Sequence, residues 1–487
     1  MCLIRFNSFF ALLFIVFSFF FTHVCAGQVN AIGNSVIYST EQLHSSNDTT
    51  VLFSVKEILI DGNKKTKEKI ILRELSFKVG DKYPLNELVS KFAEAKKRLM
   101  NTTLFRNVVV SLNSLNAYDV SINITVVERW YIFPMPFVKV VDNSLQNWVK
   151  QEGMDLRRVN YGIKTTHKNL TGNNDRLVMN VTNGYTKKLF FRYEGVQLDR
   201  ELKWTTGFST SLGKNRDIKY ATVNNLALTY KNPDRYVHSF FNVSGDLTYR
   251  PAIKTRHTVG LGYTHEKILD TVSNISNVFP DNKHKIDFAE LFYRFQYQDV
   301  DFLPYPTKGY IVETQLDKKG FGGDLNLWQV TSRLSASWPI SQKNFFNWRA
   351  TGVLKLPFDQ PYKLQNFVGT GGMYLQGYEE YVIDGVAGGF TKLTLAHEFL
   401  NRSYKIPSQK IKRLNNIPLK IYGKVYGNTG YIYDKDDDSS NRLTNRWLFS
   451  GGVGVDIILF YDFAIKIEWS LNHLGQNGIY LHDRAYL

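Results

Sequence analysis

The ten residues Phe463-Ala-Ile-Lys-Ile-Glu-Trp-Ser-Leu-Asn472 decide the fold class. Apolar and polar side chains alternate along this stretch, which is the two-residue period of a β-strand. One face of the strand therefore suits lipid, and the other face suits water. The first face carries Phe463, Ile465, Ile467, Trp469 and Leu471, and the second carries Ala464, Lys466, Glu468, Ser470 and Asn472.

The same alternation recurs in short segments along the last three-quarters of the chain, for example over residues 289–298. This region contains no apolar run long enough for a spanning helix, and a closed barrel is the other structure that satisfies the backbone in lipid. We therefore predict a β-barrel membrane protein with an antiparallel transmembrane barrel of about sixteen strands over residues 131–487, since bacterial barrels favour even strand numbers. The weakest candidate strand, residues 222–230, is expected in an extracellular loop. A soluble β-sandwich is the alternative.

The first thirty residues have the pattern of an export signal. Arg5 precedes an apolar run from Phe9 to Phe21 that is interrupted by Ser18, and small residues follow before Gly27. We expect a signal peptide over residues 1–26 and a polar linker over residues 27–50. A retained membrane anchor is the alternative, although the apolar core is shorter than the ~20 residues that a spanning helix needs.

Cysteine content and charge exclude several classes of function. Cys2 and Cys25 are the only cysteines, and both lie in the predicted signal peptide, so the mature chain is expected to use neither disulfides nor thiolate chemistry. The formal net charge of +16 is spread along the chain, whereas nucleic-acid binding needs a focused basic patch on a recognisable module. We expect no nucleic-acid partner. A lumen or loops that favour acidic segments or lipid headgroups explain the charge better.

The sequence offers no recognisable catalytic or metal motif. The pairs His265-Glu266 and His397-Glu398 lack a second histidine at the spacing that zinc requires. Neither a Gly-x-Ser-x-Gly elbow nor a phosphate-binding loop occurs. The acidic stretch 434–438 is followed by Ser439, where a calcium loop needs glycine. We expect a protein that is not an enzyme and that uses no cofactor and no metal.

A small α+β unit is predicted before the barrel, over residues 51–130. The pattern predicts a strand over residues 53–60 and a first helix after it. A second, amphipathic helix follows Pro84, and two strands over residues 105–112 and 118–127 complete the unit. The predicted order is strand, helix, helix, strand, strand.

That order resembles a POTRA domain. The resemblance rests on Ile60-Asp-Gly-Asn63 after the first strand, Gly80 between the helices and Leu104-Phe105 at the second strand. In that family the exposed sheet edge captures an extended client segment as an additional strand, through largely sequence-blind backbone pairing. The resemblance implies a periplasmic domain that binds unfolded or extended client polypeptides. A generic stabilising α+β module is the alternative.

The stretch GGMYLQGY at residues 371–378 resembles the long loop of BamA/TamA-type outer-membrane assembly proteins, the bacterial surface antigen barrels. The loop signature of that family is apolar-Arg-Gly-aromatic, and here Leu375, Gln376, Gly377 and Tyr378 stand in its place. A second family signature, aromatic-x-acid-x-glycine on a strand, has its counterpart at residues 426–430. Both charges of the family pattern are missing. An ordinary glycine-bearing loop is the alternative.

In that family the loop folds into the barrel, and its arginine meets the aspartate of the strand across the lumen. The resemblance implies the same contact between Gln376 and Asn428, whose amides can exchange hydrogen bonds. Such a pair loses the charge assistance of an arginine–carboxylate contact, so we hypothesise that the loop is held less tightly here. Alternation also places Glu398 and Asp456 toward the lumen, and these two residues, with Gly430, are candidates to contact the loop.

The chain ends in a penultimate strand, a tight turn and a short last strand that carries Ile479, Leu481 and Tyr486. In the family this strand pairs weakly with the first strand and forms an opening seam. The resemblance therefore implies an outer-membrane protein assembly, insertion or translocation factor that receives extended clients through its POTRA domain and this seam. Its implied partners are outer-membrane lipid, client polypeptides and periplasmic or lipoprotein accessory subunits. A passive pore or structural barrel, and a two-partner secretion transporter, are the alternatives.

Overall fold

The computed structural model describes most of the chain after the predicted linker. The predicted signal peptide, the predicted linker and Tyr486 lie outside the described residues. Within the described part, no helix is long and apolar enough to cross a bilayer. The described residues are 51–141, 154–275, 278–322, 325–369, 373–405, 416–435, 440–459 and 463–482.

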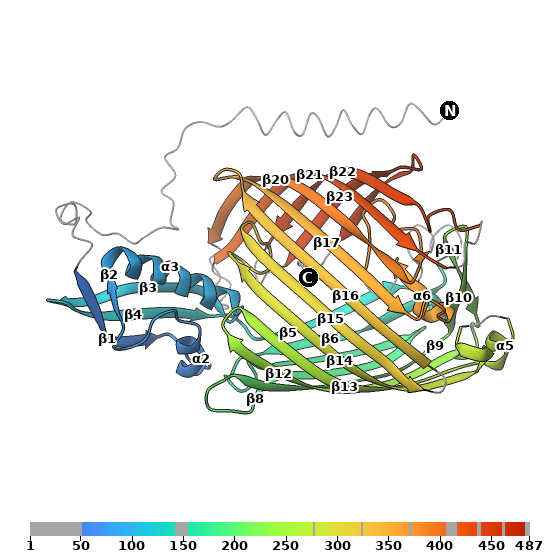
Figure 1. Ribbon diagram of the computed structural model, residues 1–487, viewed down its shortest axis with the longest axis horizontal. Coiled ribbons are helices and arrows are strands. Elements are labelled where there is room, and N and C mark those ends of the chain that lie inside the picture. Colours follow the sequence, from blue (N-terminus) through green and yellow to red (C-terminus); the bar gives the residue numbers. More distant parts are fainter. Residues whose placement is uncertain are drawn as a thin grey trace. The chain divides into compact units, whose positions relative to one another are not determined.

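A four-stranded sheet with two helices forms the first folded unit (Figure 1). The strand order is β2-β1-β4-β3, in which β1 and β4 are parallel and the other pairs are antiparallel. The predicted order of elements is confirmed, with the short strand β2 added before the second helix. The elements are β1 (Leu52–Asp61), α2 (Glu68–Arg73), β2 (Lys82–Pro84), α3 (Leu85–Asn101), β3 (Phe105–Asn116) and β4 (Asp119–Glu128).

The periodicity of α3 explains the core of this unit. Leu88, Phe92, Ala95 and Leu99 recur every three or four residues and are all buried, because they lie on one face of the helix. They pack with alternating residues of the strands, such as Val108 of β3, in one hydrophobic cluster.

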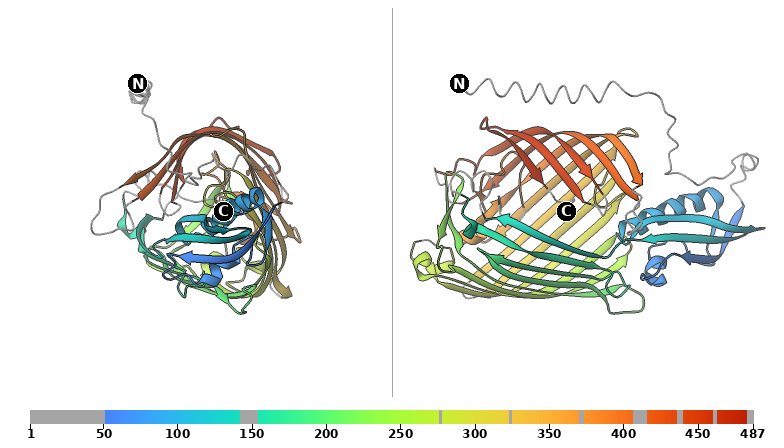
Figure 2. Two further views of the ribbon diagram at one scale, coloured as in Figure 1. Left: turned by 90° about the vertical axis from the view of Figure 1, so that its left-hand side faces the viewer. Right: turned by 180° about the vertical axis from the view of Figure 1, so that it is seen from behind.

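Sixteen strands form a single antiparallel sheet that follows the chain order from β5 to β24 and curls into a barrel (Figure 2). The prediction of about sixteen strands is confirmed. The strands are β5 (Ile132–Val140), β6 (Val159–Lys168), β7 (Arg176–Gly184), β8 (Lys187–Gln197), β9 (Trp204–Asn215), β12 (His238–Ala252), β13 (Thr255–Ile268), β14 (Lys285–Val300), β15 (Gly309–Gly322), β16 (Leu325–Pro339), β17 (Asn344–Leu356), β20 (Ala387–Lys405), β21 (Asn416–Tyr433), β22 (Trp447–Ile458), β23 (Ala464–Asn472) and β24 (Asn477–His482).

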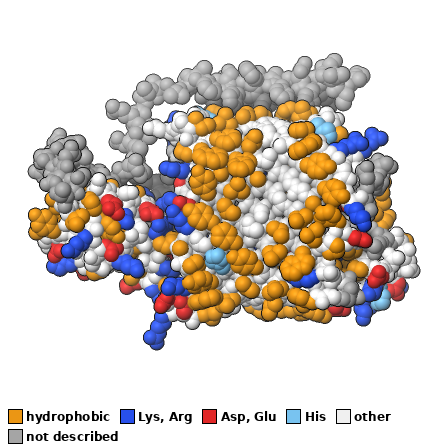
Figure 3. Space-filling view, in the orientation of Figure 1, with side chains coloured by type: hydrophobic (Ala, Val, Ile, Leu, Met, Phe, Trp, Pro, Cys, Tyr) orange, Lys and Arg blue, Asp and Glu red, His pale blue; other side chains and the backbone are white. Residues whose placement is uncertain are grey.

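The two faces of the barrel wall have different surroundings, as the alternation in β23 requires. Trp469 is 43% exposed on the outer face, whereas Glu468 beside it is 1% exposed on the inner face. Hydrophobic side chains gather on the outer surface shown in Figure 3, and charged side chains collect toward the ends of the strands. The expectation that the polar face of β23 meets water is therefore wrong, because this face is buried inside the barrel.

The weakest strand candidate does not belong to the barrel sheet. Residues 222–230 fall in a separate hairpin of β10 (Asp217–Val223) and β11 (Leu226–Lys231), inserted between β9 and β12. By strand parity this hairpin lies at the barrel end opposite to the end at which β5 begins. Short helical segments also lie between strands, namely η1 (Leu156–Arg158), α5 (Asp270–Ser273), η2 (Pro280–Asn282) and α6 (Tyr362–Gln365).

Candidate functional site

Between β17 and β20, the described residues 357–369 and 373–386 form a luminal loop, and Gly371 and Gly372 of the predicted loop motif lie outside the described residues. The loop contains α6 and the short strands β18 (Asn366–Val368) and β19 (Ile383–Asp384), which pair with each other. Its apolar side chains pack against the inner wall, so the loop fills part of the lumen. The shared cluster comprises Val353, Phe367, Val368, Leu375, Tyr378, Ile383, Phe390, Ile432, Leu443 and Leu448.

Gln376 makes the polar contact at the tip of the luminal loop. Its side-chain Nε2 donates a hydrogen bond to Oε1 of Glu468 on β23, at 2.7 Å, and both side chains are almost fully buried. The predicted pairing of Gln376 with Asn428 is wrong. Asn428 instead donates to Oγ of its cross-strand partner Ser450, at 3.1 Å, and the Ser450 hydroxyl donates to the backbone carbonyl of Gln376. Ser450 therefore stands between the two predicted partners.

The cation that faces Glu468 comes from the barrel wall. Nζ of Lys424, on β21, lies 2.6 Å from Oδ1 of Asp456 and also donates to Oε1 of Glu468. The hydroxyl of Tyr305 donates to Oδ2 of Asp456 at 2.9 Å. Lys424 thus bridges the two buried carboxylates, and Nε2 of His482 on β24 lies 3.3 Å from Oε2 of Glu468, so both ionisable partners of Glu468 belong to the wall.

Gly377 and Tyr378 fix the loop against the last strands. Gly377 has a φ of +88°, and a Cβ at this position would lie 2.9 Å from Cβ of Ser450, so only glycine fits without strain. Nδ2 of Asn472 donates to the Gly377 carbonyl at 2.8 Å. The Tyr378 hydroxyl lies 2.9 Å from the backbone oxygen of Phe449 and 3.1 Å from its nitrogen.

The other residues predicted to contact the loop are Glu398, Asp456 and Gly430, and their contacts below are with residues outside the luminal loop. Glu398 accepts a hydrogen bond from the Tyr422 hydroxyl at 2.9 Å, and Asp456 accepts from Tyr305. Gly430 packs against the neighbouring strand β20. The prediction that these residues hold the loop is therefore corrected. The residues that do so are Glu468, Ser450 and Asn472, and two of them belong to the polar face of the stretch that decides the fold.

The barrel sheet has two free edges among the described residues, one on β5 and one on β24. These strands are the first and the last in the sheet order, and they are not paired with each other. On β24 the side chains of Ile479 and Leu481 are 74% and 71% exposed. We call this opening between β5 and β24 the seam, and Ile479 and Leu481 belong to β24, one of its two edges.

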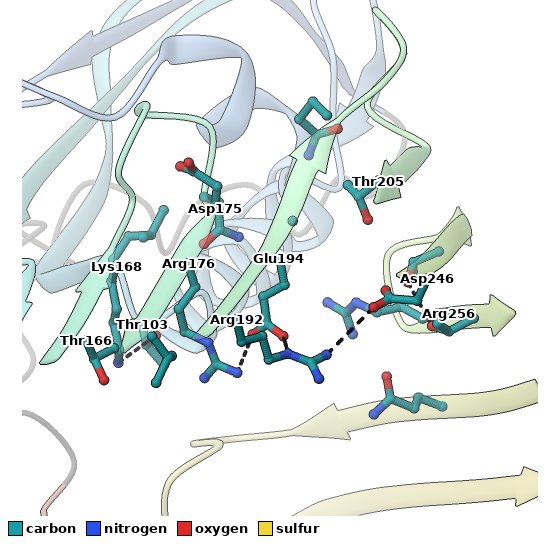
Figure 4. A pocket seen from close by; sticks show the side chains of 18 of the residues that line it. Thr103, Thr166, Lys168, Asp175, Arg176, Arg192, Glu194, Thr205, Asp246 and Arg256 are labelled. Atoms are coloured by element: carbon teal, nitrogen blue, oxygen red, sulfur yellow. Dashed lines mark hydrogen bonds and ion pairs between the residues drawn. The ribbon is translucent and has the colours of Figure 1, made fainter. Parts of the chain in front are cut away.

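A basic cavity of about 1120 Å³ is lined by barrel strands between β6 and β14 and by Arg73, Thr103 and Leu104 of the first folded unit (Figure 4). Arg192 pairs with Glu194 and lies 4.0 Å from Asp246, and Arg176 pairs with Glu194. The remaining basic side chains exceed the acidic ones, so the cavity favours anionic groups. Its charged lining residues are Arg73, Lys164, Lys168, Arg176, Lys188, Arg192, Arg250, Arg256 and Arg294 against Asp175, Glu194 and Asp246.

Glu74 of the first unit forms a bidentate ion pair with Arg250 of β12, with distances of 2.7 and 2.8 Å. Burial raises the pKa of the Glu74 carboxyl, but the hydrogen bonds and charge of Arg250, together with Arg73, outweigh it and lower the pKa to about 2. Nearby, Nζ of Lys97 lies 2.9 Å from Oδ1 of Asp299. These pairs join the first unit to the barrel strands.

The histidine–glutamate pairs that the sequence analysis set aside have structural partners. Nδ1 of His265 lies 2.6 Å from Oδ1 of Asp287, and Nδ1 of His397 lies 2.8 Å from Oδ1 of Asn344. Across the described ranges, no group of three or more His, Cys, Asp or Glu side chains is arranged to hold a metal ion.

Comparison with known families decides the relationship of the chain. The family model of the Omp85 superfamily domain matches residues 169–459, which is more than half of the chain. The chain belongs to the Omp85 superfamily. A POTRA model, described as the surface antigen variable number repeat, matches residues 53–129. A comparison with curated proteins finds no match.

Several solved structures are similar to the chain. CdiB from Escherichia coli is 9% identical with a TM-score of 0.52, and the match covers 89% of this chain and 74% of that one. BamA from Haemophilus ducreyi lacking POTRA domains 1–3 is 15% identical with a TM-score of 0.47, covering 88% and 83%. CdiB from Acinetobacter baumannii is 13% identical with a TM-score of 0.47, covering 88% and 74%.

The resemblance to BamA/TamA-type barrels with a POTRA domain is thus confirmed. This Omp85 protein is an outer-membrane barrel whose POTRA domain lies in the periplasm. Members of the superfamily are transporters or assembly factors that handle polypeptides at the outer membrane, so the chain serves translocation or assembly there.

Proposed function

We propose that this Omp85 protein receives extended client polypeptides at its POTRA domain and passes them to the seam, where they enter or cross the outer membrane. The observation that carries the proposal is that neither β5 nor β24 has a second partner strand among the residues that the structure describes. In a passive pore we expect a closed sheet, because each unpaired backbone N–H or C=O group in lipid costs free energy. An open edge is instead a surface to which another strand can add.

The POTRA sheet offers the first receiving surface. One edge of this sheet is β2, which has three residues and ends in Pro84, and the other edge is β3, which has twelve residues. An extended segment gains affinity from backbone hydrogen bonds along a sheet edge, so a longer edge binds a longer segment. We assign the client contact to β3.

The luminal loop supports a route that can open. Gln376 is neutral, and Glu468 keeps the cation Lys424 when the loop moves away. A buried carboxylate without a partner costs several kcal/mol, and this wall avoids that cost. We therefore propose that the luminal loop stabilises the inner wall when it is bound there, and that it can leave the wall at a low cost in free energy.

Photo-crosslinking from the POTRA edge tests the proposed function. A crosslinking amino acid replaces Val109, which is 39% exposed on β3, and a control replaces Val89, which is 49% exposed on α3. The probe is a urea-denatured eight-stranded outer-membrane barrel protein, diluted onto the full chain in liposomes. We expect adducts from position 109 together with protease-protected barrel product. Adducts from position 89 alone, or no adducts from either position, would contradict the proposal.

A passive, anion-selective pore is the second candidate function, because the cavity lined by barrel strands and the first folded unit is strongly basic. The two candidates differ in whether the seam must open. Bridging the seam should leave conductance intact for a pore, but should stop the handling of clients. The proposed route from the POTRA domain to the seam is the same for a client that inserts into the membrane and for a client that crosses it. Two-partner secretion is one form of the second case.

A further inference from the structure

The two edges of the seam differ in the backbone groups that they present. In an antiparallel ladder, successive residues of a strand direct their N–H and C=O groups to opposite neighbours. At an edge strand, every second residue therefore points to the free side. The pairing of β5 with β6 and of β24 with β23 identifies these residues on each edge.

On β5, the odd-numbered residues bond to β6. The Tyr131 carbonyl accepts from the Lys168 N–H at 2.8 Å, and the Val141 N–H donates to the Arg158 carbonyl at 3.0 Å. Both pairs fit the register of the ladder between them, which runs without a bulge. The even-numbered residues of β5 therefore direct their backbone groups into the seam.

Pro134 and Pro136 both occupy even positions of β5. Proline has no N–H, so the free edge of β5 offers acceptors at these positions and no donors. Between Ile132 and Val138 the edge is without a donor for about 20 Å, at about 3.4 Å per residue. Prolines are tolerated in a strand only where the missing N–H faces away from the ladder, and such prolines discourage the pairing of an edge.

On β24, the groups that face the seam are complete. The Asn472 N–H donates to the Gln476 carbonyl at 3.0 Å, and in this register the even-numbered residues bond to β23. Asn477, Ile479 and Leu481 therefore present their N–H and C=O groups to the seam, and none of them is proline. The exposed side chains of Ile479 and Leu481 continue the apolar outer face of the barrel.

The luminal loop also holds β24 in place from inside. The rings of Tyr374 and His482 stack with centroids 4.7 Å apart, at one end of β24. At the other end, the Tyr381 hydroxyl bonds the side chain of Gln476. The strand is therefore fixed in an extended form before anything adds to it, which lowers the entropic cost of pairing.

We infer that β24 is the edge that receives the client strand, and that Pro134 and Pro136 keep β5 from competing for it. The occupant is an extended segment of a membrane-spanning β-strand, with apolar side chains at alternate positions to match Ile479 and Leu481. This inference rests on the proposed function and names the binding edge within it.

A strand peptide tests this inference on the full chain in detergent micelles. The probe is a nine-residue peptide with the sequence of β5 in which valine replaces both prolines, and which carries a terminal cysteine. It reacts with a chain that has one cysteine, introduced by Ile479→Cys on β24 or by Val138→Cys on β5. These sites are matched, since the side chains are 74% and 77% exposed, and the chain after Gly27 contains no cysteine.

We expect the disulfide yield at position 479 to exceed the yield at position 138 at least tenfold. Replacing both prolines of the chain, by Pro134→Val with Pro136→Val, should raise the yield at position 138 severalfold. It should also lower the yield at position 479, since β5 can then pair with β24. Met135→Val is the matched control, because the Met135 N–H faces β6, and it should change neither yield.

A yield at position 138 that equals or exceeds the yield at position 479 would overturn the inference, as would the absence of adducts at both positions. The yields at positions 479 and 138 are compared in chains that keep both prolines, so this comparison does not depend on the folding of the proline variant. The proposed function fails separately, if the peptide adds to β24 but the denatured barrel protein never crosslinks at Val109. Adducts at Val109 together with peptide capture on β5 would overturn the inference alone.

Discussion

The side-chain amide of Gln376 lies 2.7 Å from the carboxylate of Glu468, yet the cation that neutralises this carboxylate, Lys424, projects from the barrel wall. The loop thus contributes a hydrogen bond but no charge to the contact. When the loop leaves, the ion pair within the wall remains. The hypothesis of a loosely held loop therefore rests on the placement of Lys424 as well as on the missing arginine.

Removing Lys424 should cost far more stability than removing Gln376. Lys424→Met removes the cation that bridges the buried carboxylates of Asp456 and Glu468, and the loss of one partner of a buried ion pair costs about 3–5 kcal/mol. Gln376→Ala removes one hydrogen bond to a charged group, worth about 1.5 kcal/mol. Urea unfolding of the full chain in micelles measures both free energies of unfolding.

A control for Gln376 lies on β14 and β15, in a part-buried bond between the same two residue types. Nε2 of Gln296 donates to Oε2 of Glu313 at 2.8 Å, which is the same kind of bond away from the loop. Gln296→Ala should cost a similar free energy and leave the protease sensitivity of the luminal loop unchanged, whereas Gln376→Ala should increase this sensitivity. If Gln376→Ala destabilises the barrel as strongly as Lys424→Met, the larger role assigned to Lys424 is wrong.

Gly377 should resist substitution for two separable reasons. Gly377→Ala imposes a left-handed backbone on alanine and drives its Cβ to 2.9 Å from Ser450. We expect a loss of about 2–3 kcal/mol, of which backbone strain accounts for about 1 kcal/mol. Gly475→Ala is the control, because Gly475 has a φ of +78° with nothing within 4 Å of its Cβ position, so it should show the strain alone. Equal losses in thermal or urea unfolding would refute the close approach of the loop to Ser450.

The contact between Glu74 and Arg250 should weaken in acid. The folded-state pKa of Glu74 is about 2, below the ordinary carboxyl value of 4.5, so its stabilisation is complete above about pH 4.5. It is lost as the pH falls from about 4.5 toward 2. Hydrogen exchange of the α2 amides in the full chain should accelerate over this range. Glu74→Gln should abolish the pH dependence, and an unchanged pH profile in that variant would show that another group is responsible.

The basic cavity should set the ion preference of the barrel. Lys164→Glu combined with Lys188→Glu reverses two charges in the cavity lining, and it should shift the reversal potential away from anion preference. Lys267→Glu is the control, since Lys267 is an exposed residue of β13 outside the lining. Planar-bilayer recording under a salt gradient measures the shift, and equal reversal potentials for the two variants would argue against this role of the cavity.

The alternation in residues 463–472 was enough to predict the barrel, because the two-residue period depends only on neighbouring residues. The loop partner was harder to predict. Asn428 holds the position of the family pattern, but its short side chain meets Ser450 before it reaches Gln376. Glu468 was visible as part of a polar face, yet only the fold of the loop shows that this face is buried.

The asymmetry of the seam could not be predicted from the sequence. Pro134 and Pro136 are visible there, but which side of β5 they affect depends on the register with β6. That register is set by pairing between residues about thirty positions apart. Likewise, the basic cavity collects side chains from strands that are distant in the sequence, so an even spread of charge along the chain conceals it.

Bridging the seam tests the central claim most directly. Val138→Cys and Ile479→Cys, joined by bifunctional maleimides of increasing length, tie β5 to β24 in the full chain in liposomes. The account predicts that the bridge stops the appearance of protease-protected barrel product from the urea-denatured probe, while ion conductance stays unchanged and the single-cysteine chains remain active. Undiminished formation of that product by the bridged chain would contradict the account.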